Sequence, residues 1–172
     1  RVRRAVALAV DVQLIREKTY RGLANPTFSI VAPGVDGYAK DLDVRPKLDR
    51  AAAKKLIAEA GYPDGFQVHL DCVNQPPAAD LCQADAVMLA QVGIRATPNM
   101  LPNPTFVPKL QKMDTSLWLQ GWGAATHDPF YVLQSMLYTR REGSALGDYN
   151  LGRWSHAGFD RVVHQIRIEA DP

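Results

Sequence analysis

The sequence predicts an α/β fold in which helices cover a small, mainly parallel sheet. A helix, a turn and a strand follow one another in residues 49–72, and a second helix and strand follow in residues 76–100. A third apolar strand is expected at residues 116–122. Because parallel strands need a crossover connection, which a helix usually supplies, this order predicts a right-handed βαβ unit. We therefore expect a layered α/β domain with helices packed on the sheet.

The first of these helices carries signals at both ends. Asp49 is a good N-cap, because its carboxylate can accept from the free backbone N–H groups of the first turn. Gly61 and Pro63 end the helix, since glycine adopts the left-handed conformation and proline cannot continue a helix. The apolar face consists of Ala52, Ala53, Leu56, Ile57 and Ala60. The strand that follows alternates Phe66, Val68 and Leu70 with the polar residues Gln67, His69 and Asp71.

The segments on either side complete the predicted topology. Asp11 is expected to cap a short helix that ends near Gly22, and residues 25–47 read as a long irregular loop of a kind that is often functional. The helix from Pro76 to Val92 should bury Leu81, Ala84, Met88 and Val92. Further helices are expected around Phe106, Leu110 and Met113, after Asp128-Pro129, and after Ser155 with Phe159, Val162, Val163 and Ile166 inward.

The composition restricts the class of protein. The apolar content is 47%, the charged content is 22% and the net charge is +2, which are typical of a globular domain. Lys and Arg are scattered along the chain, so a nucleic-acid partner is not indicated. The chain begins at Arg1 and stops at Pro172 inside helical patterns, and we expect it to be truncated at both ends.

Two segments resemble a known family. Residues Arg45 to Asp49 and the run from Ala53 to Phe66, which ends in Ala-Gly-Tyr-Pro-Asp-Gly-Phe, are similar to the family 5 extracellular solute-binding proteins. These are the dipeptide- and oligopeptide-binding components of bacterial ABC importers. The helix of residues 2–11 resembles an earlier motif of the same family, although Val12 stands where the family usually has a basic residue. A later motif of the family resembles Tyr149-Asn150 and Phe159-Asp160.

The resemblance implies a role in transport rather than catalysis. It implies that residues 1–172 form a single lobe like that of type II periplasmic binding proteins, the later, C-terminal lobe of a two-lobe protein. The missing N-terminal lobe would close with it on a peptide or similar small solute and deliver that solute to the ABC transporter permease subunits. The expected location is the periplasm or the outer face of the cell membrane, with no cofactor.

The loop after the third predicted strand is the best candidate binding site. Ligands of open α/β sheets collect outside the carboxyl ends of strands, and the indole of Trp122, which follows Gly121, offers a flat apolar face and one N–H donor. Thr126, His127 and Asp128 complete the loop, although Asp128 is also a candidate helix cap. Tyr38 is a further candidate, for ligand contact or for covering the core.

The resemblance also exposes a departure at this loop. Peptide binders of the family place an Asp three residues after the Trp to receive the α-amino group of the ligand, whereas Ala125 stands here. Ordinary dipeptides are therefore not assumed, and modified peptides, glutathione-like solutes, sugars and opines remain open.

Cys72 and Cys82 are either a disulfide or two buried small residues. Comparable pairs in the family favour the disulfide.

Two other classes of function compete with binding of a transported solute. His127, Asp128 and Thr126 could belong to a small hydrolase, although adjacent residues seldom form a catalytic relay and no nucleophile elbow is present. An interaction domain for another protein is the third alternative. His156, Asp160 and His164 share one helical face, but we interpret them as a polar face rather than a metal site.

Overall fold

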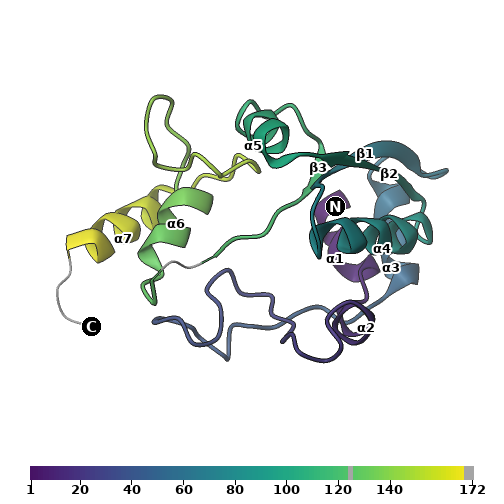
Figure 1. Ribbon diagram of the computed structural model, residues 1–172, viewed down its shortest axis with the longest axis horizontal. Coiled ribbons are helices and arrows are strands. Elements are labelled where there is room, and N and C mark those ends of the chain that lie inside the picture. Colours follow the sequence, from purple (N-terminus) through teal and green to yellow (C-terminus); the bar gives the residue numbers. More distant parts are fainter. Residues whose placement is uncertain (124–125, 169–172) are drawn as a thin grey trace. The chain divides into compact units, whose positions relative to one another are not determined.

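The computed structural model describes residues 1–123 and 126–168 and forms two compact units (Figure 1). Unit 1 comprises Arg1–Pro26, Arg45–Lys109 and Thr115–Gly121. Unit 2 comprises the described residues of Thr27–Val44, Leu110–Asp114 and Trp122–Pro172. Ala125 and the predicted end of the last helix lie outside the described residues. The organisation of the whole chain as one lobe stays a prediction.

Unit 1 contains the parallel sheet that the sequence predicts. The strands β1 (Phe66–Val73), β2 (Ile94–Leu101) and β3 (Leu117–Leu119) lie in the order β2-β1-β3, and both pairs are parallel. The helix α4 (Ala78–Ala90) forms the crossover between β1 and β2. The α/β fold is therefore confirmed. Strand β3 is shorter than predicted, because it pairs only with three residues of β1.

The core of unit 1 lies between three helices and the sheet. Helix α1 (Val2–Ala9) packs against α3 (Arg50–Glu59) and α4, while α4 packs against β1 and β2 (Figure 1). The buried residues of this core are Ala5, Leu8, Ala9, Ala53, Ile57, Leu89, Val92 and Ile94. The helix α5 (Asn103–Gln111) follows β2 and begins in unit 1. These contacts confirm the apolar face predicted for α3.

The predicted N-caps of two helices are confirmed. The carboxylate of Asp49 accepts from the backbone N–H of Ala52 at 2.8 Å. The carboxylate of Asp11 accepts from that of Leu14 at 3.0 Å and starts α2 (Val12–Lys18). Helix α2 thus ends before the predicted stop at Gly22.

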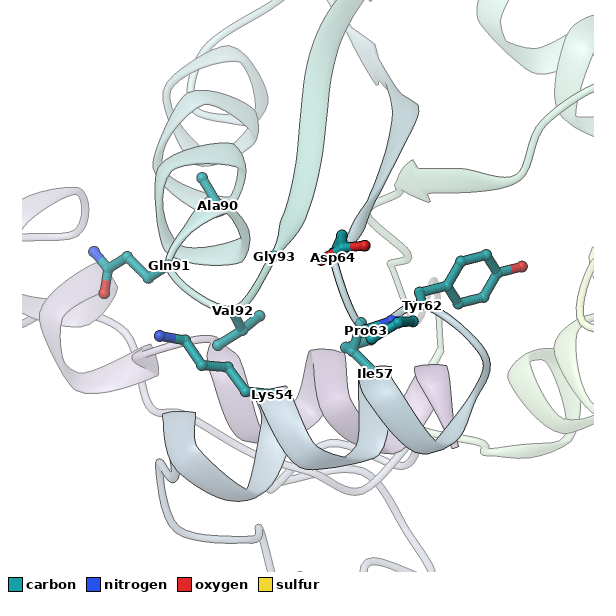
Figure 2. Close-up of a pocket in the computed structure, with 10 residues that line it drawn as sticks. Lys54, Ile57, Tyr62, Pro63, Asp64, Ala90, Gln91, Val92 and Gly93 are labelled. Carbon is teal, nitrogen blue, oxygen red and sulfur yellow. The ribbon is translucent and has the colours of Figure 1, made fainter.

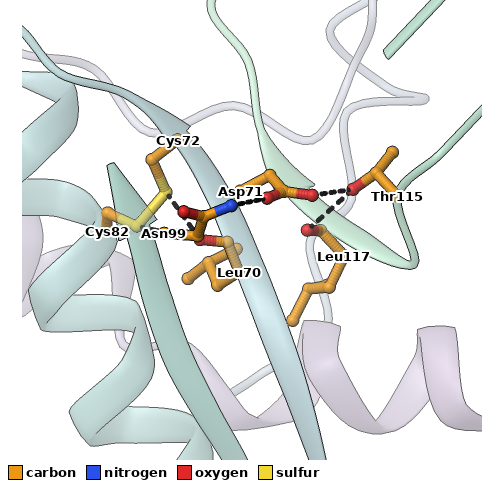
Figure 3. Close-up of a disulfide and its surroundings, with 7 residues drawn as sticks. All are labelled: Leu70, Asp71, Cys72, Cys82, Asn99, Thr115 and Leu117. Atoms are coloured by element: carbon orange, nitrogen blue, oxygen red, sulfur yellow. Dashed lines mark hydrogen bonds between the residues drawn. A yellow bond between two sulfur atoms is a disulfide. The ribbon is translucent and has the colours of Figure 1, made fainter. Parts of the chain in front are cut away.

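The buried face of α4 differs from the predicted one. Cys82, Ala86, Met88 and Leu89 are buried, whereas the predicted Leu81 and Ala84 are half-buried. The reason is visible in Figure 3, where Cys82 of α4 points to β1 and forms a disulfide with Cys72. The two Cα atoms are 6.3 Å apart, and both cysteines are buried beside Leu70. Cys82 therefore faces the sheet, and the residues one and two turns further, Ala86 and Leu89, are buried with it.

Asp71 is buried, although the alternation of β1 places it on the polar face with Gln67 and His69. Asn99 Nδ2 and Thr115 Oγ1 each donate to its carboxylate at 2.6 Å (Figure 3), and Lys109 Nζ lies 3.2 Å away. Burial by itself would raise the pKa of Asp71, but the hydrogen bonds from Thr115 and Asn99 and the ion pair with Lys109 outweigh it and lower that pKa. On the face of β1 that carries Gln67 and His69, the buried carboxylate of Asp71 is therefore paired with a positive charge and with two hydrogen-bond donors.

Unit 2 is built on two short helices and long loops. Helices α6 (Phe130–Met136) and α7 (Ala157–Ile168) pack against each other (Figure 1). The predicted cap Ser155 is wrong, because the Nδ1 atom of His156 accepts from the backbone N–H of Phe159 at 3.0 Å. The inward position predicted for Val162 is also wrong, since its side chain is 50% exposed while Val163 is buried.

The polar face predicted for α7 has structural partners. His164 Nε2 lies 2.8 Å from the hydroxyl of the buried Tyr138, and Asp160 accepts from the backbone N–H of Thr139 at 3.0 Å. Both side chains therefore fix the segment that leaves α6. Asn150 is the other centre of the unit: its amide donates to the carbonyls of Tyr138 and Trp154, at 2.9 and 2.6 Å.

Candidate functional site

The indole of Trp122, in unit 2, contacts two further aromatic rings. The ring of Tyr131, on α6, stacks on the indole at 5.5 Å between centroids and 30° between planes. The ring of Tyr149 meets it edge-on at 4.9 Å. Trp122 is half-buried, while Tyr131 is 47% exposed. We call Trp122, Tyr131 and Tyr149 the aromatic cluster, which offers a rigid apolar surface with part of one ring open to solvent.

The indole N–H of Trp122 is an unsatisfied donor within the cluster. Its Nε1 atom is buried, and no acceptor for it lies among residues 1–123 and 126–168. A buried donor without an acceptor costs about 1–3 kcal/mol, which is regained when an acceptor arrives. The cluster therefore has an apolar surface and, beneath it, one buried donor that has no acceptor in the described part of the chain.

The loop that carries Tyr38 is organised around Asp43. The carboxylate of Asp43 accepts from Thr27 Oγ1 at 2.7 Å, from the backbone N–H groups of Phe28 and Ser29 at 2.6 and 3.0 Å, and from the Tyr38 hydroxyl at 2.8 Å. The bond from Thr27, then those from Phe28 and Tyr38, lower the pKa of Asp43 to about 2. The Tyr38 hydroxyl thus has a structural role, and a ligand contact through it stays a prediction.

His127 connects two loops of unit 2. Its Nδ1 donates to the carbonyl of Gly34 at 3.0 Å, and its own carbonyl accepts from the backbone N–H of Asp36 at 2.9 Å. The Asp128 carboxylate instead accepts from the backbone N–H of Phe130 at 2.7 Å, next to the start of α6. The N-cap of α6 is Pro129, so the prediction of Asp128 as the capping residue is wrong by one position. In the described residues, His127 and Asp128 bond to different partners. This geometry does not support a hydrolase.

The remaining predicted site residues are exposed. Thr126 is accessible, and Gly121, the last residue of unit 1, has open space around the position of a side chain. The structure thus brings Trp122 together with two rings that the sequence analysis did not single out, Tyr131 and Tyr149. A signal for them was present in the aromatic residue two places after Asp128-Pro129 and in the Tyr149-Asn150 motif.

A cavity of about 380 Å³ in unit 1 lies at the amino ends of β1 and β2 (Figure 2). It is opposite to the carboxyl ends where ligands of open α/β sheets collect. Tyr62 and Gln91 point away from it in opposite directions (Figure 2). A side chain on Gly65 would overlap the carbonyl of Gly93, which accepts from the backbone N–H of Phe66 at 3.0 Å. This end of the sheet is a packing contact between two turns.

Two kinds of feature are absent from the described part of the chain. Among the described residues, no three His, Cys, Asp or Glu side chains come together to hold a metal ion. None of the helices in the described ranges is long and apolar enough to span a bilayer.

Comparison with known proteins places the chain in a family. The family model of the bacterial extracellular solute-binding proteins, family 5 Middle, matches residues 1–144. Heme-binding protein A of Haemophilus influenzae is 26% identical over 96% of this chain and 30% of its own length. The probable deoxycholate-binding periplasmic protein YgiS of Escherichia coli K12 is 29% identical over 96% of this chain and 31% of its own length. The chain thus spans less than a third of these curated relatives.

A solved structure shows the same fold. The periplasmic binding protein DppA of Helicobacter pylori, in complex with the peptide STSA, superposes with a TM-score of 0.83. The alignment covers 97% of this chain and 32% of DppA at 21% identity. The three-stranded parallel sheet with its helices is therefore an element of the periplasmic binding protein fold. Because the family model covers most of the sequence, the chain belongs to the bacterial extracellular solute-binding proteins of family 5.

Proposed function

We propose that this chain forms one lobe of a two-lobe binding protein that captures a peptide or similar small solute by cleft closure. The remaining lobe of the same polypeptide would supply the other wall of the cleft, and the permease subunits of an ABC importer would receive the solute. Family 5 solute-binding proteins are non-enzymatic transport receptors, which argues against the hydrolase alternative. An interaction domain for another protein would instead form a stable complex without any small solute.

The aromatic cluster carries the proposal for the binding surface. Its partly exposed rings and the unsatisfied indole N–H of Trp122 suit a solute with an apolar surface and a hydrogen-bond acceptor. The relatives are named for heme and deoxycholate, and DppA was solved with a peptide. A modified peptide or another apolar solute with a carbonyl acceptor is therefore the proposed ligand class, in place of an ordinary dipeptide with a free amino terminus.

The proposed location is the periplasm or the outer face of the cell membrane. The disulfide between Cys72 and Cys82 supports this location, because disulfides persist in oxidising compartments and are rare in the cytosol. The name of YgiS as a periplasmic protein is consistent with it.

The test is to identify by mass spectrometry the solute that co-purifies with the intact polypeptide, after release by denaturation. Trp122→Ala should lose that solute, because both the ring and the donor are removed. Trp122→Phe keeps an apolar ring without the N–H, and should weaken binding about tenfold, the effect of one hydrogen bond.

The matched control is Tyr62→Ala, which removes a partly exposed aromatic ring from unit 1 and should leave solute binding unchanged. Retention of the solute by Trp122→Ala would contradict the proposed surface. Turnover of a chromogenic ester that His127→Ala abolishes would contradict the binding function itself.

A further inference from the structure

Unit 2 contains a second cavity that shares no residue with the aromatic cluster. Its volume is about 410 Å³, within the range of small-molecule sites. It is lined by Met113 and by residues of two loops, one after α6 and one before α7. The charged and aromatic residues of its wall are Arg140, Glu142, Arg153 and Trp154.

Two guanidinium groups of this wall donate hydrogen bonds to uncharged acceptors, although the charge of Arg140 also acts on the nearby carboxylate of Asp148. Arg140 donates from Nη1 to the carbonyl of Asp148 at 2.6 Å and from Nη2 to the carbonyl of Gln111 at 3.0 Å. Arg153 Nε donates to the sulfur of Met113 at 3.0 Å. Neither arginine forms an ion pair within 4.0 Å in the described part of the chain. The wall therefore presents preorganised positive charge, which suits a carboxylate.

The indole of Trp154 is fixed beside these charges. Its ring stacks on His156 at 5.9 Å with 9° between planes, and Phe159 meets it edge-on at 5.2 Å. Its backbone is held by Asn150, whose amide accepts from the Trp154 N–H at 3.1 Å and donates to the carbonyl of Trp154. The side chain nevertheless remains 42% exposed. A rigid, exposed aromatic side chain contributes apolar contact at little cost in conformational entropy.

The remaining polar groups of the wall narrow the ligand class. Glu142 adds one carboxylate, which can receive an ammonium group, and Thr139 and Ser155 add hydroxyl groups. We propose that this cavity is a second binding site, for a small zwitterion with a carboxylate, an ammonium and an apolar or aromatic side group. Arg153 and Arg140 receive the carboxylate, Glu142 receives the ammonium, and Trp154 contacts the side group.

A short segment of chain connects the second cavity with the candidate site. Tyr149 lies against Trp122 in the aromatic cluster, and its neighbour Asn150 holds Trp154 at the cavity. The second site does not depend on the proposed transport ligand, because none of its lining residues belongs to the aromatic cluster.

The test follows the indole N–H signals in nitrogen–proton NMR spectra of the intact polypeptide during titration with L-phenylalanine. The signal of Trp154 is assigned from the spectrum of Trp154→Phe. The titration is made in the Trp122→Ala background, so that failure of the transport site cannot be confused with failure of the second site. We expect a saturable shift of the Trp154 signal at millimolar phenylalanine, the affinity of a small ligand with few contacts.

Three comparisons sharpen the result. Phenethylamine lacks the carboxylate and should not shift the Trp154 signal. Arg153→Gln should weaken phenylalanine binding at least about tenfold, because a charge-assisted bond is lost. The matched control Arg21→Gln removes an exposed arginine with the same left-handed backbone from unit 1, at φ 52° against 51°, and should have no effect.

A second variant guards against misfolding of Arg153→Gln. Glu142→Gln should weaken binding of phenylalanine but not of phenylacetate, which has no ammonium. The absence of a saturable shift at about 10 mM phenylalanine, equal binding by Arg153→Gln and Arg21→Gln, or equal binding of phenethylamine would each overturn the second site.

Discussion

In unit 1, apolar side chains from three helices and the sheet meet in one continuous core, whereas in unit 2 single polar side chains hold the loops. Ile57, Leu89 and Ile94 are buried together in unit 1. In unit 2, Asp43 accepts four hydrogen bonds within one loop and Asn150 ties two segments through backbone groups. The difference is between many interchangeable contacts and a few specific ones.

This contrast bears on function. An apolar core stays in place when its surface changes, because each residue shares its contacts with many neighbours. Loops held by single hydrogen-bonding residues can differ between relatives while the core is kept. Both proposed binding surfaces lie in unit 2, where Asn150 holds Trp154 through hydrogen bonds and Trp122 rests against two aromatic rings. We therefore expect the two units to respond separately to substitution.

The largest effect is expected from Ile57→Ala in unit 1. Removing a fully buried branched side chain should lower the free energy of unfolding by about 3 kcal/mol, because it leaves a cavity among α1, α3 and α4. Urea denaturation gives the change, and amide hydrogen exchange locates it. Protection should fall first in α3 and β2. The control Val87→Ala, at a side chain that is 63% exposed, should cost less than about 0.5 kcal/mol.

A smaller effect is expected from Asn150→Ala in unit 2. The carbonyls of Tyr138 and Trp154 and the N–H of Trp154 would lose their partner, which should cost about 2 kcal/mol. Hydrogen exchange should rise in residues 138–154 while β1 and β2 stay protected. Asn25→Ala, at an exposed position in unit 1, is the matched control. Equal loss of protection in β1 would show that the units unfold together, and the comparison between them would fail.

The smallest effect is a pH dependence that belongs to unit 1 alone. Burial raises the pKa of Asp85 from 3.8 to about 6, although the charge of Arg45 opposes the rise. The folded protein then holds this proton more tightly than the unfolded chain. The stability that Asp85 contributes is therefore fully present below pH 3.8 and is lost as the pH rises through 6.

Asp85→Asn should accordingly stabilise unit 1 at pH 7, by at least about 1 kcal/mol, the energy of one pKa unit, and have little effect near pH 4. Urea denaturation from pH 4 to 8 measures both values. The exposed Asp64→Asn is the control. A wild-type protein whose stability does not fall over this range, or a variant with the same slope, would exclude Asp85 as the cause.

Most of unit 1 could be predicted from residue patterns, and little of unit 2 could. The caps Asp49 and Asp11 act within three residues along the chain, so their bonds follow from local sequence. The burial of Asp71 could not be predicted from the alternation in β1, because its partners Asn99, Thr115 and Lys109 come from distant segments of the chain. The cap of α7 is a different case, because the bond from Phe159 to His156 spans only three residues and the prediction chose the neighbouring Ser155 instead.

The candidate site shows the same division. Trp122 could be identified from its place after a strand, but its partners Tyr131 and Tyr149 are 9 and 27 residues further along the chain. The structural role of His127 could not be predicted for a similar reason. Its ring donates to the carbonyl of Gly34, which lies in a loop without a regular period. Contacts between irregular segments leave no repeating signal in either partner.

By itself the sequence determined the α/β class, the helix caps Asp49 and Asp11 and the strand order along the chain, because short-range hydrogen bonds and apolar periodicity act between near neighbours. Only the tertiary structure decided which polar groups are paired: Asp71 with Lys109, Tyr38 with Asp43 and Asn150 with two carbonyls. It also decided that the indole N–H of Trp122 stays without an acceptor in the described part of the chain. Pairing of buried polar groups depends on segments far apart in sequence, so it is settled when the chain packs.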